Sequence, residues 1–426
     1  MKHVRLFLLL FLICLHACKE NTITLIEEET HNELNVIEQE SLRRHKQTKA
    51  YGCYLQLLDE MQPTTRSTSS EEYPEYYGGA YINEENLLVI RIKDKATSTR
   101  AINELYTRME ESVIFEPCKF SFNELNTTIE ILLSNITTNE IMRRNITMLA
   151  IDVEQNKVAV CMKDTLCLQS RLLESLINDN SILTYIKSED ADSTVINDES
   201  TMRSYNTSDT LFYGGRIAAG YIWGKIENAG SIGYRAIDRN GNKGFVTAAH
   251  VVLDSAGVLL PKIYDAKAAV QAIGTCYNYA YHNQNMDAAF VECYDDITLT
   301  NYIPGFTASS GDTLSTDLIR PVTGMYLSMI GHVSGVRTGK VIYPRSILLP
   351  HNTTDENSGQ IVLRDVIIAD FYGTKGDSGG LVFGEDANMK YCAAGIYIGR
   401  GILNGKTVST SVIANNANAS LGVTRY

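Results

Sequence analysis

The sequence predicts an all-β C-terminal part over residues 213–426, preceded by a small α/β unit over residues 76–196. From residue 211 onward, short apolar runs alternate with turns rich in Gly, Asn, Asp and Ser, which is the pattern of many short antiparallel strands. The charge divides the chain at the same place. After position 212 lie 17 of the 38 basic and 17 of the 50 acidic residues, so the net charge of −12 belongs to the preceding part. This step indicates two units with different roles.

The N-terminus has the pattern of an export signal. Two basic residues among the first five precede an apolar run over Leu6–Leu15, and Ala17 is small enough to precede a cleavage site. The run is short for a transmembrane helix, so residues 1–17 are predicted to be a signal peptide. The string LHAC, which ends at Cys18, resembles a bacterial lipoprotein box apart from its histidine. A secreted, extracellular protein and one anchored to the cell envelope through Cys18 both remain open.

Two polar segments flank the α/β unit. Residues 18–75 form an acidic leader that we expect to be flexible, because it offers little apolar surface to bury. Residues 197–212 form a polar linker between the two units. Because the charge changes here, we expect the two units to be separated by proteolysis in this linker, near Leu211–Tyr213.

The α/β unit over residues 76–196 is predicted from two repeated patterns. The segments Gly78–Lys93 and Met148–Met162 each have the alternation of two strands joined by a polar turn. Between them, Ala101–Ser112 and Asn123–Ile141 have apolar residues at helical spacing. We therefore expect two hairpins and two helices in this unit.

Composition excludes several function classes. The negative net charge argues against nucleic acid as a partner. No metal-ligand cluster, phosphate loop or nucleotide fingerprint stands out, so we predict no metal and no cofactor. The nine cysteines do not have zinc-site spacing, and a Cys276–Cys293 bridge between neighbouring strands is a weak prediction.

The string KGDSGGL places one serine, Ser378, among three glycines. A nucleophile elbow of the α/β-hydrolase type has the pattern G-x-S-x-G, but its catalytic histidine follows the serine in the chain. None of the eight histidines follows Ser378, so that interpretation has no base. The order His, Asp, Ser is available instead, because all histidines of the C-terminal part precede the serine: His250, His282, His332 and His351.

Two neighbours complete a candidate triad. His250 ends the apolar string GFVTAAH, where two alanines leave room for an imidazole beside a cleft. Asp287 begins the apolar string DAAFVE, and a carboxylate at the edge of such a strand needs a hydrogen-bond partner. Taken alone, His250 is more simply a histidine of the core, and Asp287 is more simply a turn residue at the end of a strand. Together with Ser378 they stand in the order that an acyl-transfer triad requires.

With these residues in place, the chain resembles the trypsin/chymotrypsin-like serine proteases. The strings GFVTAAH, MDAAFVE and GDSGG are most similar to the secreted bacterial branch of alpha-lytic protease and the streptogrisins. YGGRIAAG resembles the start of the mature proteases of that branch, and SGVRTGKV resembles a glycine loop in mid-chain. The motif resemblance extends over Tyr213–Arg400, and weaker similarity to the pro-region strands extends over Tyr76–Asp164.

The resemblance implies a fold and a mechanism. The fold is two six-stranded antiparallel Greek-key β-barrels preceded by a small α/β pro-region. His250 would act as general base, Asp287 would hold its tautomer, and Ser378 would form an acyl-enzyme that water then hydrolyses. The N–H groups of Gly376 and Ser378 would form the oxyanion hole. Asp377 matches the family's buried acid that supports this loop.

The sequence also departs from the family. Relatives of the bacterial branch pair the loop aspartate with an arginine where Val333 stands here, and Arg337 is the nearest substitute. Ile398 stands where relatives have a serine that hydrogen-bonds the catalytic aspartate. Two bridges typical of the family are missing. These departures leave the loop geometry open and motivate a second hypothesis, a catalytically dead protease fold that acts as a binding module.

The resemblance places the substrate pocket on two segments. Position 372 is a tyrosine, whereas a trypsin-like enzyme would carry an acid there. The resemblance therefore argues against cleavage after Lys or Arg and favours cleavage after apolar residues. The predicted lining residues are Tyr372, Gly373, Lys375, Tyr397, Ile398 and Gly399.

The N-terminal unit has a predicted role of its own. A two-barrel β domain has high contact order and folds slowly, and a protease needs kinetic stability because unfolded copies are digested. The chain's own pro-region would therefore act as folding aid and inhibitor. The preferred hypothesis is a secreted serine endopeptidase made as a zymogen that acts on polypeptides. A lipid-anchored envelope protease shares its chemistry and differs in location.

Overall fold

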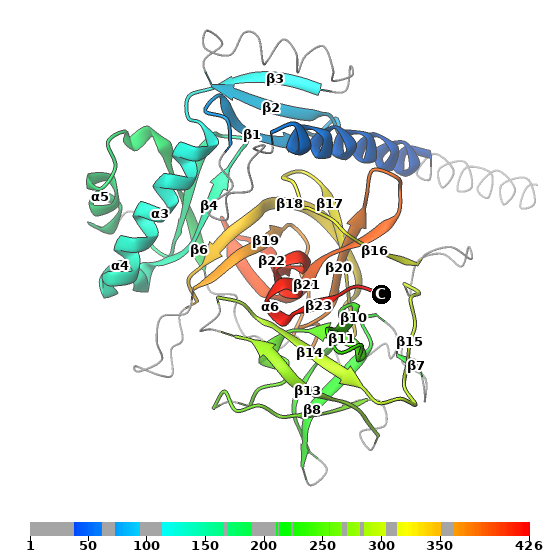
Figure 1. Cartoon of the computed structure of the whole chain (residues 1–426). Coiled ribbons are helices and arrows are strands. Elements are labelled where there is room, and N and C mark those ends of the chain that lie inside the picture. Colours follow the sequence, from blue (N-terminus) through cyan, green and yellow to red (C-terminus); the bar gives the residue numbers. More distant parts are fainter. Residues whose placement is uncertain are drawn as a thin grey trace, which may run out of the picture.

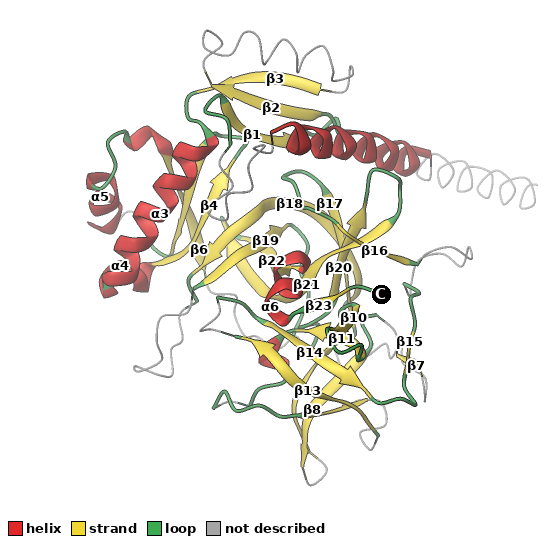
Figure 2. Ribbon diagram, viewed as in Figure 1, coloured by secondary structure: helices red, strands yellow, loops and turns green. Residues whose placement is uncertain are grey.

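The computed structural model describes most of the chain from residue 38 to the C-terminus, and strands dominate it (Figures 1 and 2). The signal peptide, the helix predicted over Ala101–Ser112 and most of the linker lie outside the described residues. The described ranges are 38–61, 73–93, 113–165, 168–189, 210–211, 213–222, 225–254, 256–265, 271–281, 285–303, 313–350 and 362–426.

The C-terminal half of the all-β part forms a closed barrel. Its six strands have the order β17-β20-β21-β22-β19-β18, and the additional pairing of β17 with β18 closes the ring. A further strand, β16, runs parallel to β21. The strands are β16 (Leu314–Leu318), β17 (Tyr326–Gly331), β18 (Gly335–Leu348), β19 (Leu363–Ala369), β20 (Leu381–Glu385), β21 (Tyr391–Leu403) and β22 (Lys406–Ile413).

The N-terminal half forms a sheet in the order β23-β10-β11-β14-β13-β12-β8-β9. Its last member, β23 (Val423–Thr424), follows the C-terminal helix α6 (Ala414–Leu421), so the end of the chain returns to the first sheet. A short parallel pair, β7 with β15, lies apart. The remaining strands are β7 (Thr210–Leu211), β8 (Arg216–Ile222), β9 (Lys225–Ser231), β10 (Arg235–Asp238), β11 (Lys243–Thr247), β12 (Lys262–Asp265), β13 (Ala272–Ala280), β14 (Ala288–Cys293) and β15 (Thr298–Leu299).

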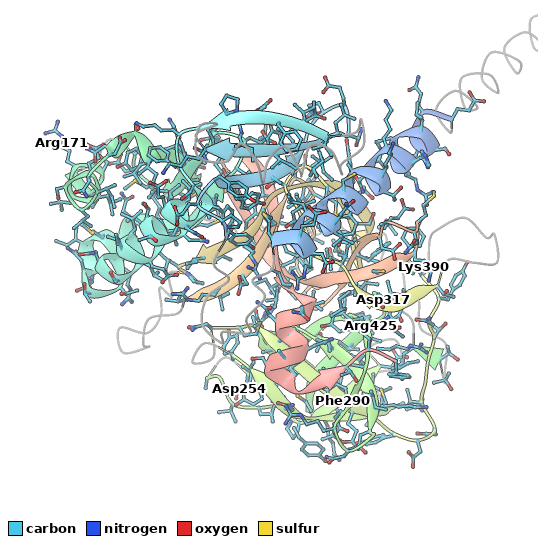
Figure 3. All side chains as sticks on the ribbon, turned by 45° about the horizontal axis from the view of Figure 1, so that its top comes forward. Arg171, Asp254, Phe290, Asp317, Lys390 and Arg425 are labelled. Atoms are coloured by element: carbon cyan, nitrogen blue, oxygen red, sulfur yellow. The ribbon has the colours of Figure 1, made fainter. Side chains whose placement is uncertain are left out.

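Apolar side chains from both halves pack between them. Tyr234 and Phe290 of the first sheet lie in one buried cluster with Leu381 and Ile396 of the barrel. Polar contacts cross the same junction. Arg425, labelled in Figure 3, donates to the carbonyl oxygens of residues in β10 and β16 at 2.9 and 2.7 Å. The prediction of an all-β C-terminal part is therefore confirmed.

The N-terminal unit contains the predicted hairpins. The strands β1–β2 and β4–β5 pair antiparallel, and helices cover β4 and β5. The predicted helix over Asn123–Ile141 is divided in two, because Asn139 accepts N–H bonds from residues 141 and 142 and so caps a new helix. The elements are β1 (Tyr77–Ile82), β2 (Leu88–Lys93), β3 (Val113–Cys118), α3 (Phe122–Thr138), α4 (Glu140–Asn145), β4 (Ile146–Asp152), β5 (Lys157–Met162), α5 (Leu168–Ser175), η1 (Asn180–Ile182) and β6 (Leu183–Glu189).

The structure differs from the predicted flexible leader over residues 38–61. These residues form a regular helix, coloured blue in Figure 1, which lies beside β1–β3 and the barrel. Tyr51 is 2% exposed and its hydroxyl accepts the N–H of Arg320 at 2.9 Å, while Gln47 accepts the N–H of Tyr326 at 2.8 Å. The buried positions recur at helical spacing, so an apolar face was present within a polar composition.

The two units share one sheet. Strand β4 pairs with β18, and β6 pairs with β21, so the N-terminal sheet extends the barrel sheet to ten strands. On the other side, the N–H of Ile82 donates to the carbonyl of Thr323 at 2.8 Å. Gly324 has a φ of +81°, and a Cβ there would lie 1.8 Å from the carbonyl oxygen of Ile82. Only glycine permits this close approach.

Cys276 and Cys293 are free, so the predicted bridge is wrong. They lie on paired strands, but Cys276 is opposite Val291 and Cys293 is opposite Gly274. None of the described helices has the length and apolar character needed to cross a membrane. Within the described ranges, no three His, Cys, Asp or Glu side chains gather into a possible metal site.

Candidate active site

The structure brings His250 and Asp287 together. Strand β11 ends at Thr247, and the short turn η3 (Ala249–Val251) presents the imidazole beside β14, where Asp287 precedes the first strand residue. The His250 side chain is 33% exposed and that of Asp287 is 8% exposed. His250 Nδ1 lies 2.7 Å from Asp287 Oδ2, and the backbone N–H of His250 donates to Asp287 Oδ1 at 3.0 Å.

The electrostatics of the pair favour a basic imidazole. Burial opposes the positive charge of His250, but the Asp287 carboxylate outweighs burial, so the pKa of His250 is raised above its ordinary value. Burial opposes the negative charge of Asp287, but His250 and two backbone N–H groups lower the pKa of this carboxyl. With Nδ1–H donating to the carboxylate, the Nε2 lone pair of neutral His250 is available to accept a proton.

Ser378 lies in a loop whose backbone is tightly hydrogen-bonded. We call Phe371–Gly380 the Ser378 loop. The N–H of Asp377 donates to Thr374 at 3.0 Å, that of Gly379 donates to Tyr397 at 2.7 Å, and that of Gly380 donates to Asp377 at 2.9 Å. Within the described chain, the N–H groups of Gly376 and Ser378 have no hydrogen-bond acceptor. These are the two donors that the sequence predicted for an oxyanion hole.

The Ser378 loop packs against the turn that carries His250. A Cβ at Gly230 would lie 2.6 Å from a methyl carbon of Val251 and 2.8 Å from the carbonyl oxygen of Ser378. A Cβ at Gly379 would lie 3.0 Å from the backbone nitrogen of Ala248. Two glycines therefore permit the loop and the η3 turn to approach closely.

Asp377 is fully buried beneath the loop, and backbone N–H groups satisfy its carboxylate. Oδ1 accepts from Val333 at 2.8 Å and from Ser334 at 3.0 Å, and Oδ2 accepts from Thr374 at 2.8 Å. Arg337, the substitute considered from the sequence, has an exposed side chain on β18. Two of the three hydrogen bonds to this carboxylate thus come from the backbone of the β17–β18 turn, and the third comes from within the Ser378 loop.

A second polar pair beneath the loop was not predicted. Ser231 Oγ lies 2.9 Å from the carbonyl oxygen of Gly376 and 3.2 Å from Nδ1 of His332. Both side chains are buried, with exposed fractions of 0% and 2%. Burial lowers the pKa of His332 to about 4, Asp377 opposes this shift, and Arg216 adds to it. The sequence showed His332 as one of four histidines but gave no sign of its partner, which lies 101 residues earlier.

The predicted pocket residues do not share one surface. Tyr372 and Lys375 are exposed, whereas the Tyr397 side chain is buried in the barrel core, where burial raises the pKa of its hydroxyl. A Cβ at Gly373 would lie 2.9 Å from Cζ of Tyr397, so ring and loop are in contact. Ile398 is partly buried between the two halves. Tyr397 is therefore a core residue beneath the loop.

A cavity of about 400 Å³ lies beside the candidate triad. From the all-β part it is lined by Asp287, Ile398 and Gly399, among others, and from the N-terminal unit by Thr147 and Glu189. The N-terminal unit therefore forms one wall of the cavity next to Asp287.

Comparisons with known proteins agree with this architecture. Residues 39–118 match the family model of the Pro-like N-terminal domain. No curated protein sequence matches the chain.

Three solved structures illustrate the similarity. A glutamic acid-specific serine protease, described as using a histidine triad in substrate binding, is 21% identical, with 51% of this chain and 100% of that chain covered and a TM-score of 0.39. Nocardiopsis protease is 19% identical, with 51% and 100% covered and a TM-score of 0.36. The alpha-lytic protease homolog N4 is 15% identical, with 50% and 98% covered and a TM-score of 0.35.

At the N-terminal end, the family match agrees with the pro-region similarity stated from the sequence. The family match extends the N-terminal domain upstream of residue 76, over the helix that was predicted as a flexible leader. Residues 39–118 match the Pro-like N-terminal domain, and an all-β part built of a closed six-stranded barrel and a second sheet follows along the chain.

Proposed function

We propose that the chain is a serine endopeptidase, made as an exported zymogen, that hydrolyses polypeptides through His250, Asp287 and Ser378. One observation carries the proposal. The His250–Asp287 pair, with a 2.7 Å contact to Nδ1 and a second bond to the backbone N–H, orients the free imidazole nitrogen and raises its basicity. A histidine that only fills space in the core would need neither a carboxylate partner nor an exposed ring.

Each residue has a defined step. His250 takes the proton of the Ser378 hydroxyl as the oxygen attacks the peptide carbonyl, and returns it to the leaving amine. Asp287 stabilises the imidazolium formed in between. The acyl-enzyme is then hydrolysed by the same groups in reverse roles. Neither step draws on a cofactor.

The free N–H groups of Gly376 and Ser378 support the oxyanion hole. The N–H groups of Asp377, Gly379 and Gly380 are engaged in hydrogen bonds within the protein, whereas those of Gly376 and Ser378 are available to meet developing negative charge. Removing one such donor typically lowers the rate about 100- to 1,000-fold. Gly376 has a φ of +102°, which a side chain would disfavour.

The junction of the two units supports a zymogen. Glu189 pairs with Ile402, and Ser188 with Leu403, so β6 runs antiparallel to β21 and points along it toward Gly399. The N-terminal unit thus docks on β21, the strand that carries the predicted pocket residues Ile398 and Gly399. Together with the shared cavity wall, this supports inhibition until the N-terminal unit is removed.

The test is covalent labelling of the secreted protein with a biotinylated fluorophosphonate, followed by mapping of the label with mass spectrometry. We expect the label on Ser378, and we expect it to disappear in Ser378→Ala and His250→Ala. Ser328→Ala and His45→Ala are matched controls, because both residues lie outside the candidate site and should retain labelling.

The outcome separates the two hypotheses. Label on Ser378 that depends on His250 establishes an activated nucleophile with its base. A folded, processed C-terminal fragment that takes no label would overturn the endopeptidase proposal and favour the binding module. The fractionation of the labelled protein between medium and envelope, with Cys18→Ser beside it, decides between secretion and a lipid anchor.

A further inference from the structure

We infer that Ser231 and His332 are positioning residues that hold the oxyanion hole in its donating conformation. The inference rests on the proposed function and names two residues that the triad does not include. Ser231 belongs to the end of β9 in the first sheet, and His332 to the turn between β17 and β18 in the barrel. The pair therefore reaches the Ser378 loop from both halves of the all-β part.

Ser231 forms hydrogen bonds to two carbonyl groups of the Ser378 loop. Its backbone N–H donates to the carbonyl of Ser378 at 2.7 Å, and its hydroxyl donates to the carbonyl of Gly376 at 2.9 Å. These two carbonyls lie on either side of Asp377. In turn, the carbonyl of Ser231 accepts the hydroxyl of Thr247 at 2.9 Å, which ties the residue to β11.

His332 determines where the Ser231 proton points. A hydroxyl has one proton to donate and two lone pairs. The backbone N–H of His332 donates to Ser231 Oγ at 3.0 Å, and Nδ1 lies 3.2 Å away. If the neutral ring carries its proton on Nδ1, both lone pairs are occupied and the hydroxyl proton is directed at Gly376. In the opposite tautomer, the Ser231 proton is directed at Nδ1, and the His332 ring is the remaining hydrogen-bond partner of the Gly376 carbonyl.

The carbonyl of Gly376 controls the orientation of the peptide that follows it. The planar peptide between Gly376 and Asp377 is held at its oxygen by Ser231 and at its N–H by Thr374. The N–H of Gly376 belongs to the preceding peptide, so Ser231 and Thr374 hold Gly376 from one side only. Glycine has broad backbone freedom, and without this support rotation about the Gly376 backbone can turn its N–H away from the substrate.

The His332 ring also limits that rotation by contact. A Cβ at position 376 would lie 2.6 Å from Cε1 of His332, which shows that the imidazole lies directly against the Gly376 backbone. The ring therefore acts on the loop in two ways, by directing the Ser231 proton and by filling the space into which Gly376 would turn.

The experiment measures fluorophosphonate labelling of the processed enzyme as two constants, the affinity for the probe and the maximal labelling rate. We expect Ser231→Ala to lower the maximal rate about fivefold or more, since one buried hydrogen bond is lost and its loss also frees Gly376. The affinity should change little, because the probe's leaving group and body bind elsewhere.

The histidine is tested by a matched pair. His332→Leu keeps the bulk and removes the donor, so we expect a loss of about tenfold in maximal rate. His332→Asn restores an N–H near the position of Nδ1, and we expect recovery to within about threefold of the wild type. Ser411→Ala is the control, because within the described structure Ser411 is a buried serine of the same barrel whose hydroxyl has no partner.

A second measurement covers variants that fold but are not processed. In the full-length Ser378→Ala protein, hydrogen exchange of the peptide over residues 371–380 should become faster on adding Ser231→Ala. Unchanged labelling constants or unchanged exchange in a folded Ser231→Ala protein would overturn the inference. Absence of label on the wild type would instead overturn the proposed function, and the exchange result would still stand.

Discussion

Asp377→Asn tests the view that backbone N–H groups replace an arginine under the Ser378 loop. The carboxylate accepts three such bonds, two at Oδ1 and one at Oδ2. An asparagine that keeps its oxygen toward Val333 and Ser334 must turn its NH₂ group toward the N–H of Thr374. Two donors then face each other, and an unsatisfied buried donor costs about 1–3 kcal/mol.

The two remaining bonds also lose charge assistance, at about 1 kcal/mol each. Burying a neutral amide costs less free energy than burying a carboxylate, and this difference offsets most of the loss of charge assistance. The Thr374 contribution remains, so we expect the free energy of unfolding to fall by about 2 kcal/mol. The maximal fluorophosphonate labelling rate should fall with it, because the loop that carries Gly376 is no longer held from below.

The assay is urea unfolding of the full-length protein, monitored by circular dichroism. The Ser378→Ala background prevents self-digestion during the measurement. Labelling is measured separately with the serine intact. Asp296→Asn serves as the control, because this acid is exposed and should leave both quantities unchanged. An Asp377→Asn protein with unfolding and labelling equal to the wild type would refute the reasoning.

Three further predictions concern the triad and the junction. Asp287→Asn should lower the labelling rate about 10⁴-fold. The acid limb of the dependence of this rate on pH should move to lower pH, because loss of the Asp287 anion lowers the pKa of His250 and a protonated imidazole cannot act as base. An acid limb that stays in place would contradict this. The pairing of β7 moves the expected cleavage upstream of the site near Leu211–Tyr213 predicted from the sequence: N-terminal sequencing should show a mature start at or before Thr210, because the strand that begins there is paired and Leu211 and Tyr213 are buried; a start beyond that strand would be inconsistent with this structure. Gly324→Ala should reduce the yield of folded protein far more than Gly257→Ala, since both have positive φ but only the first abuts the N-terminal unit; equal yields would contradict the docking described here.

The candidate triad could be proposed from the sequence because its evidence is local. Each of His250, Asp287 and Ser378 stands in a short string whose small and apolar neighbours already describe the site, and the order of the three selects the chemistry. The hairpins of the N-terminal unit were predictable for the same reason, since a turn and its flanking strands are contiguous. The division of the helix at Asn139 was missed because capping by a side chain competes with apolar periodicity that continues past it.

Other features depend on contacts distant in sequence. The helix over residues 38–61 is polar on most of its surface, and only its docking on the barrel shows why Tyr51 is buried. Tyr397 was assigned to a pocket because of its place in the chain, but the neighbouring strands turn its ring into the core. The partnership of Ser231 with His332 joins two sheets, and no single stretch of sequence contains it.

The shared ten-stranded sheet has a consequence for what the mature protein would present to its surroundings. When the N-terminal unit leaves, β18 loses its partner at Ser346–Leu348 and β21 loses its partner at Ile402–Leu403. Backbone donors and acceptors on both edges become unpaired, and such edges attract any extended chain. The second edge lies on β21 itself, the strand that carries the predicted pocket residues Ile398 and Gly399. Removal of the N-terminal unit, as proposed above, would therefore turn two paired strand edges into open ones, so that activation and exposure to unwanted strand pairing would be the same event.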